Sequence, residues 1–161
     1  MKFSSSSPLL LTFVAATVSQ AQDIPDLSSV PGKVMDGLKT RFPQAEVQKL
    51  TEEKEGDIMV YDFEFLVDGQ RFEADIKEDG SIHNWEKEIA AIDLSGPVRK
   101  SMEMRYPKAS VKEVMQIIAV ENGTEELEGF EIVIQTREGK EEEITIAPDG
   151  KVLEDSGTNK E

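Results

Sequence analysis

The chain contains no cysteine and only one histidine among its 161 residues. Without cysteine there are no disulfides, no thiolate metal ligands, no cysteine nucleophile and no lipid-modified N-terminal cysteine. The single histidine, His83, excludes multi-histidine metal sites. It also lacks a nucleophile, because Ser81 lies in a predicted turn and there is no Gly-x-Ser-x-Gly motif. We therefore expect no enzymatic activity and no cofactor.

Positive charge is scarce. The chain has 18 Lys and Arg against 33 Asp and Glu, which gives a formal net charge of -15. A nucleic-acid-binding protein needs clustered cations to displace counterions from phosphates, and an anionic membrane surface repels a chain of this charge. These figures exclude binding to nucleic acid and to an anionic membrane surface.

Long hydrophobic runs are absent apart from residues 8–18, near the N-terminus. A short start carrying Lys2, an apolar stretch and the sequence Ser19-Gln20-Ala21 predict a secretory signal peptide over residues 1–21. The apolar stretch is shorter than the roughly 20 residues of a transmembrane helix, although an uncut anchor remains the alternative. We expect an exported protein, periplasmic or extracellular, without membrane insertion after signal removal.

The remaining chain contains an internal repeat. Val30, Gly32, Val34, Leu38, Phe42 and Pro43 recur in order as Leu94, Gly96, Val98, Met102, Tyr106 and Pro107. Later positions follow, with Phe63 and Phe65 matched by Phe130 and Ile132. The predicted organisation is a disordered start at 22–27, one unit at 28–92, a second unit at 93–155 and a disordered tail at 156–161.

Each unit is predicted to contain one helix followed by strands. Apolar residues recur every four positions from Val30 to Phe42 and again from Leu94 to Tyr106, which is typical of an amphipathic helix ended by a proline. Apolar and polar residues then alternate, as in residues 61–67 and 130–135. The predicted fold class is α+β, with two tandem units, each one helix packed on a roughly four-stranded antiparallel sheet.

Asp-Gly pairs punctuate these strands at residues 68–69, 79–80 and 149–150, and each pair predicts a hairpin turn. Residues 75–86 also imitate a calcium-binding loop. However, Lys77 stands where an oxygen ligand is required, so we predict a hairpin there and no metal site.

The pattern of a helix, an aromatic-Pro pair, strands and a final Asp-Gly hairpin resembles the PepSY domain. It is clearest at Tyr106-Pro107 and Asp149-Gly150, and residues 79–89 resemble PepSY-like proteins grouped with beta-lactamase-inhibitory protein. The resemblance covers about residues 28–155 and implies a secreted bacterial, non-catalytic module, sometimes an inhibitor or a protease-associated regulator. The inhibitors use disulfides, which this chain lacks.

One face of the predicted sheet should be open to solvent. If Ile82 points to the core, period-two alternation places His83 and Trp85 on the open face. Trp85 is the only tryptophan and is a candidate interface anchor, unless the other unit or the linker covers it. The predicted partner-binding residues are Trp85, His83, Leu66, Glu64, Asp75, Glu131, Val133 and Glu143.

These observations predict a secreted module that binds a protein partner, such as an inhibitor or regulator of an exported hydrolase or peptidase. The alternative is an acidic envelope protein that binds divalent cations or a small ligand, because carboxylates are dense. No converging set of metal ligands supports that alternative.

Overall fold

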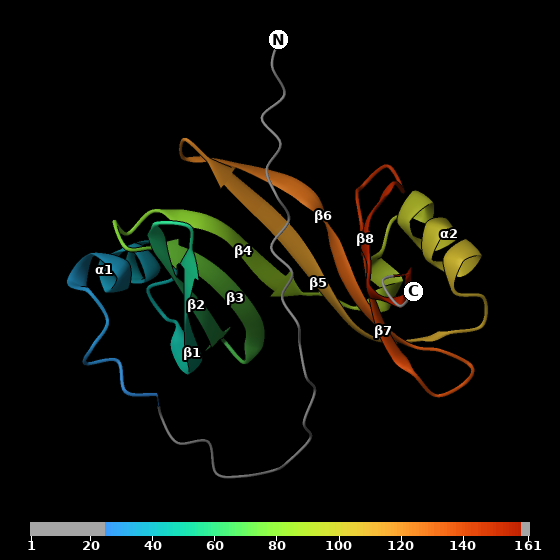
Figure 1. Cartoon of the computed structure of the whole chain (residues 1–161), viewed down its shortest axis with the longest axis horizontal. Helices are drawn as coiled ribbons and strands as arrows, with labels where there is room; N and C mark the ends of the chain where they lie inside the picture. The colour runs from blue at the N-terminus through green and yellow to red at the C-terminus, as the bar shows by residue number, and fades with distance from the viewer. Residues whose placement is uncertain (1–24, 159–161) are drawn as a thin grey trace.

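The computed structural model describes residues 25–158 of the chain. Its described part is one antiparallel sheet whose eight strands follow one another in sequence order, with two helices (Figure 1). The elements are α1 (Gly32–Arg41), β1 (Glu46–Glu55), β2 (Ile58–Val67), β3 (Gln70–Lys77), β4 (Ile82–Glu88), α2 (Gly96–Arg105), β5 (Ser110–Glu121), β6 (Thr124–Gln135), β7 (Glu141–Ile146) and β8 (Val152–Asp155). Short 3-10 turns, η1 (Ala91–Asp93) and η2 (Ser156–Thr158), complete it.

The predicted fold class of two tandem units, each one helix packed on a roughly four-stranded sheet, is wrong; whether two such units would share one continuous sheet was left open by the sequence. Strands β4 and β5 pair antiparallel from Asn84 opposite Ala119 to Glu88 opposite Met115, so all eight strands form a single sheet. Alternation of polar and apolar residues predicts the face of each strand but not its neighbour across a helical connection. The boundaries of the two repeated units, at 28–92 and 93–155, stay a prediction.

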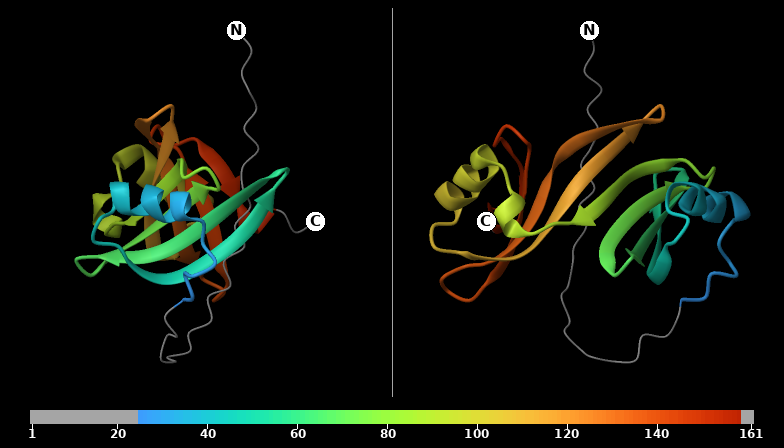
Figure 2. Two further views of the ribbon diagram at one scale, coloured as in Figure 1. Left: turned by 90° about the vertical axis from the view of Figure 1, so that its left-hand side faces the viewer. Right: turned by 180° about the vertical axis from the view of Figure 1, so that it is seen from behind.

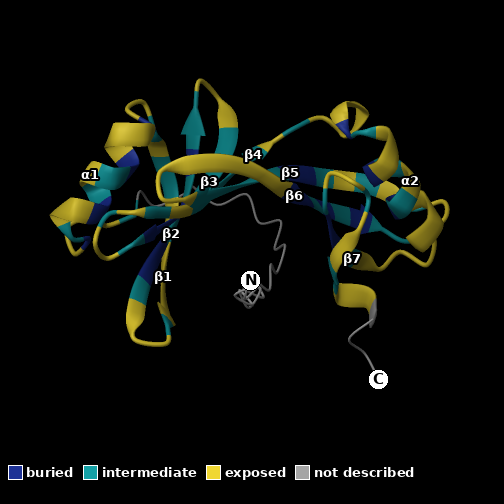
Figure 3. Cartoon of the chain, turned by 90° about the horizontal axis from the view of Figure 1, so that it is seen from above, coloured by how far each residue is buried: buried dark blue, intermediate teal, exposed yellow. Residues whose placement is uncertain are grey.

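Both helices form where the apolar stripes predicted them. Val34 and Leu38 of α1 are fully buried, as is Val98 of α2. Each helix ends before an aromatic residue that precedes a proline, Phe42 and Tyr106, because the residue before proline disfavours helical geometry. The helices lie at opposite ends of the sheet (Figure 2) and on the same side of it (Figure 3).

The strand register explains why the helices share a side. Phe65 lies opposite Phe72, which lies opposite Lys87, and the row continues through Gln116 and Phe130. Directly opposed residues point to the same face of a sheet. One end of this row packs under α1 and the other under α2, so one face carries two apolar cores. We call this the helix-covered face, and the opposite one the open face.

The three predicted Asp-Gly turns are confirmed. They connect β2 to β3, β3 to β4 and β7 to β8, and their glycines have positive φ angles of 79°, 89° and 93°. Only glycine adopts these angles without steric cost, which explains the residue at each turn. Residues 75–86 therefore form a hairpin, as predicted.

The predicted signal peptide, residues 1–21, lies outside the described residues. Within the described part, neither helix has the length and hydropathy of a membrane span. The expected disordered tail begins with an ordered turn. Ser156 accepts a hydrogen bond from the Glu143 backbone N–H at 2.8 Å.

Candidate functional site

The open face carries acidic side chains directly opposite one another. Glu64 on β2 lies opposite Glu73 on β3, which lies opposite Glu86 on β4. Asp62 and Asp75 are opposed in the adjacent row, two residues along the strands. Like charges placed opposite each other on neighbouring strands destabilise a sheet. The arrangement therefore costs stability, which is unusual unless the face has a function.

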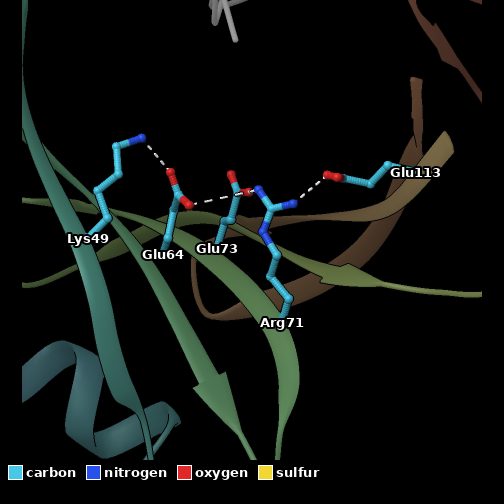
Figure 4. Close-up of polar contacts among 5 residues, drawn as sticks. All are labelled: Lys49, Glu64, Arg71, Glu73 and Glu113. Carbon is cyan, nitrogen blue, oxygen red and sulfur yellow. Dashed lines mark hydrogen bonds and ion pairs between the residues drawn. The ribbon is translucent and has the colours of Figure 1, made fainter. Parts of the chain in front are cut away.

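Arg71 is the cation at the centre of this face (Figure 4). Its guanidinium bonds to Glu73, donates to Glu113 at 2.5 Å and lies 3.9 Å from Glu64. Lys49, from the edge strand β1, donates to Glu64 at 2.5 Å. These contacts neutralise part of the charge and connect β3 to β5 across β4.

The open face continues over β5, β6 and β7. Glu113 on β5 lies opposite Val133 on β6, which lies opposite Glu143 on β7. One pair further along, Met115 lies opposite Glu131. Met115 is buried although it belongs to neither apolar core under a helix. Apolar and acidic residues are therefore mixed on this half of the face.

Burial shifts the titration of these carboxyl groups. It raises the pKa of Asp62 and that of Glu73 to about 7, with Asp75 adding repulsion at Asp62 and Arg71 opposing the rise at Glu73. It raises the pKa of Glu131 to about 8, with further repulsion from Glu143. The pKa of Glu86 is well above its ordinary value for the same reason, with Glu131 and Glu73 adding to it. Several carboxyl groups of the open face therefore still bind protons near neutral pH.

Six of the eight predicted site residues lie on the open face. The strand pairings place Glu64, Asp75 and Leu66 at one end and Glu131, Val133 and Glu143 at the other. The two remaining residues are His83, which is exposed and whose charge acts on Asp75, and Trp85.

Trp85 lies on the helix-covered face, so its predicted outward orientation is wrong. Asp75 pairs with Asn84 while Ile76 pairs with Ile82, which makes His83 an extra residue in β4. This bulge reverses the alternation, so Ile82 and Trp85 both point to the core under α1. Glu125 of β6 accepts a hydrogen bond from the indole N–H of Trp85 at 3.1 Å, while Trp85 itself stays half-buried. The alternative that the other unit or the linker covers Trp85 stays a prediction.

The sequence reasoning missed Arg71, Glu86 and Glu113 as members of the open face. Glu86 was missed through the same bulge, which no residue pattern announces. Arg71 and Glu113 lie on strands that become neighbours only through the β4–β5 pairing. One signal in the sequence could have identified Arg71. Cations are scarce in this chain, and Arg71 is a cation within predicted strands that are rich in acidic residues.

Three further observations bear on chemistry. Among residues 25–158, no three acidic or histidine side chains are grouped so that they could hold a metal ion. The acidic residues are spread along rows that cross the sheet. On the helix-covered face, Trp85 lines a small pocket together with Phe42 and Phe72. The acidic residues of the open face are thus spread over several strands and do not converge on one point.

No family model matches the chain, and no curated protein matches it either. The PepSY part of the sequence resemblance therefore stays a prediction. Several solved structures do match in fold, and three of them are described next.

A BLIP-like protein from Bacteroides fragilis is 20% identical, with a TM-score of 0.53, over 78% of this chain and 84% of that one. A candidate periplasmic protein from Bacteroides eggerthii is 14% identical, with a TM-score of 0.60, over 81% and 93%. A DUF2874 family protein from Bacteroides uniformis is 13% identical, with a TM-score of 0.59, over 80% and 91%. The chain therefore shares the fold of a BLIP-like protein and of DUF2874 family proteins.

Proposed function

We propose that this protein is an exported, non-catalytic module of the periplasm whose open face binds a basic surface of a protein partner. The BLIP-like and periplasmic neighbours support a binding role in that compartment. If the partner is an exported hydrolase or peptidase, the protein acts as its inhibitor or regulator.

The observation that carries the proposal is the row formed by Glu64, Glu73 and Glu86. These side chains are half-buried and opposed across three strands, and the pKa values of Glu73 and Glu86 are raised. A lysine or arginine from a partner would relieve the repulsion and favour ionised carboxylates. The free protein therefore carries a cost that a basic partner offsets.

The apolar residues on the same face supply contact area. Leu66 lies opposite Arg71, and Val133 lies between Glu113 and Glu143. A protein interface typically combines such apolar contacts with charged groups around them. The face thus offers both electrostatic steering and a packing surface.

The first test is affinity capture from periplasmic extract with three versions of the protein. The open-face variant replaces three half-buried glutamates by glutamine: Glu73, Glu86 and Glu131. The control variant replaces three exposed glutamates away from this face by glutamine, the same formal substitution: Glu78, Glu103 and Glu138. We expect a partner captured by the wild type and the control and lost from the open-face variant. A partner that all three capture equally would contradict the proposal.

Stability and binding should change in opposite directions in the open-face variant. Glutamine removes like-charge repulsion, so thermal unfolding should occur at a higher temperature while capture falls. A purely structural role for these glutamates predicts no loss of capture. This contrast separates a binding defect from misfolding.

Divalent cations give the alternative outcome. Calcium that binds the native state selectively would raise the unfolding temperature with calcium concentration. If calcium stabilises the wild type strongly and the open-face variant not at all, while no protein partner is captured, cation binding replaces the present proposal.

A further inference from the structure

A small pocket lies on the helix-covered face, remote from the acidic rows. It has a volume of about 310 Å³, at the lower end of the range for small-molecule sites. It opens beside the C-terminal end of α1, between that helix and the strands beneath it. The residues that define its chemistry are Arg41, Phe42, Val67, Phe72, Trp85 and Lys87.

Three aromatic rings form its apolar wall. The ring centroids of Phe42 and Phe72 are 5.7 Å apart, those of Phe42 and Trp85 are 5.8 Å apart, and those of Phe72 and Trp85 are 6.2 Å apart. Phe42 is buried, whereas Phe72 and Trp85 are only half-buried. The rings are in contact with one another, and the exposed parts of Phe72 and Trp85 can make offset or edge contacts with one more aromatic ring.

Among the residues that the structure describes, the charged ones that line the pocket are both cations, in a chain with a net charge of -15. The Arg41 guanidinium lies 4.9 Å from the ring centroids of both Phe42 and Trp85. The Lys87 ammonium lies 5.8 Å from the ring centroid of Phe72. Within residues 25–158, Lys87 forms no ion pair. Because Arg41 already pairs with Glu125, Lys87 is the lining cation with which a ligand can pair.

A carboxylate of the chain itself already binds at the rim. Glu125 accepts from Arg41 Nε at 2.7 Å, from Arg41 Nη2 at 3.2 Å and from Trp85 Nε1 at 3.1 Å. These hydrogen bonds lower the pKa of Glu125. The rim thus already favours an ionised carboxylate beside an indole ring.

We propose that this pocket binds a small aromatic carboxylate. Its ring would lie against Phe72 and Trp85, and its carboxylate would pair with Lys87, since Glu125 already occupies Arg41. The pocket volume favours a single ring with a short side chain over a longer molecule. The site is independent of the open face, because Trp85 and Lys87 belong to the other side of the sheet.

The test is a fluorescence titration of the exported chain with 3-phenylpropionate. Trp85 is the only tryptophan, so its emission reports on this pocket alone. We expect a saturable change with a Kd of about 1 mM or tighter. The uncharged 3-phenylpropionamide should bind about twofold to fivefold more weakly, because an exposed ion pair adds little more than that. No saturation up to about 20 mM, or equal affinity for acid and amide, would overturn the proposal.

Lys87→Met separates charge from packing, because methionine keeps most of the apolar stem. Affinity for the acid should fall to that for the amide, while affinity for the amide should not change. Lys151→Met, in the turn between β7 and β8, is the matched control and should bind like the wild type. Melting curves confirm that each variant is folded. If Lys87→Met binds the acid as tightly as the control, the assignment of Lys87 is wrong.

Discussion

The indole Nε1 of Trp85 donates a hydrogen bond of 3.1 Å to the Glu125 carboxylate, although 40 residues separate the two in sequence. Glu125 lies near the tip of the hairpin formed by β5 and β6. The same carboxylate pairs with Arg41 at the end of α1. One hairpin of the second half of the chain is thereby attached to the core under the first helix.

We expect Glu125→Ala to lower the free energy of unfolding by about 0.5–1 kcal/mol, because the ion pair is partly exposed and each hydrogen bond contributes modestly. Urea unfolding followed by Trp85 fluorescence measures this loss. Glu126→Ala, the exposed neighbour, is the control. The difference between the two variants should shrink at high salt. Equal stability of both variants at low salt would show that the contact adds nothing.

Trp85→Ala should lower the free energy of unfolding by about 2–3 kcal/mol, since Trp85 packs against Phe42 and Phe72 but stays half-buried. Trp85→Phe should recover most of this loss. Capture of a partner by the open face should not change in either variant. If capture is lost while stability is unaffected, Trp85 is an interface anchor after all.

Because the eight strands form one sheet, the chain should unfold in one cooperative step. Phe63→Ala and Phe130→Ala should each cost about 3–5 kcal/mol, since both side chains are buried. Each substitution should shift the whole transition, measured by circular dichroism and by Trp85 fluorescence. Ile92→Ala, at a residue that is 76% exposed, is the control. Two separated transitions in either variant would indicate that the halves unfold independently.

Stability should fall as pH rises from about 4 to about 8. The pKa values of Asp62, Glu73 and Glu131 are higher in the folded state than in the unfolded chain, so the unfolded state ionises first. The contribution of these protonated groups to the free energy of unfolding is therefore complete below about pH 4, and it is lost as the pH rises through about 7 to 8. We expect the melting temperature at pH 8.5 to lie at least about 5 °C below that at pH 5.5.

The double variant Glu73→Gln and Glu131→Gln should flatten this pH dependence, because glutamine does not titrate. Glu78→Gln and Glu138→Gln, both exposed, should keep it. A melting temperature of the wild type that rises with pH over this range would mean that these carboxyl groups are better solvated than the structure indicates.

Binding of a basic partner should show the opposite pH trend. Partner cations favour ionised carboxylates, so capture should strengthen from pH 5.5 to pH 8 with release of protons. The open-face variant, which lacks Glu73, Glu86 and Glu131, should show little such trend. Isothermal titration calorimetry in two buffers of different ionisation enthalpy would measure the proton release.

Local features of this protein follow from its sequence. The apolar stripe from Val30 to Phe42 is sufficient to predict α1, and the proline after Phe42 is sufficient to end it. The Asp-Gly pairs select hairpin turns because glycine adopts a positive φ angle. Alternation over residues 61–67 places Phe63 in the core and Glu64 on the opposite face, since successive side chains of a strand point to opposite sides.

Long-range relationships were decided only by the tertiary structure. The pairing of β4 with β5 joins strands separated by a helix, and it makes one eight-stranded sheet where the sequence predicted two tandem helix-and-sheet units. The extra residue His83 in β4 moves Trp85 from the predicted open face to the core under α1 and puts Glu86 in line with Glu64 and Glu73. The order of polar and apolar residues does not predict such a bulge, because a bulge is a change of backbone conformation and pairing. The bulge adds Glu86 to the acidic row and Trp85 to the aromatic pocket, and the β4–β5 pairing brings Glu113 next to Arg71; both depend on contacts between distant segments.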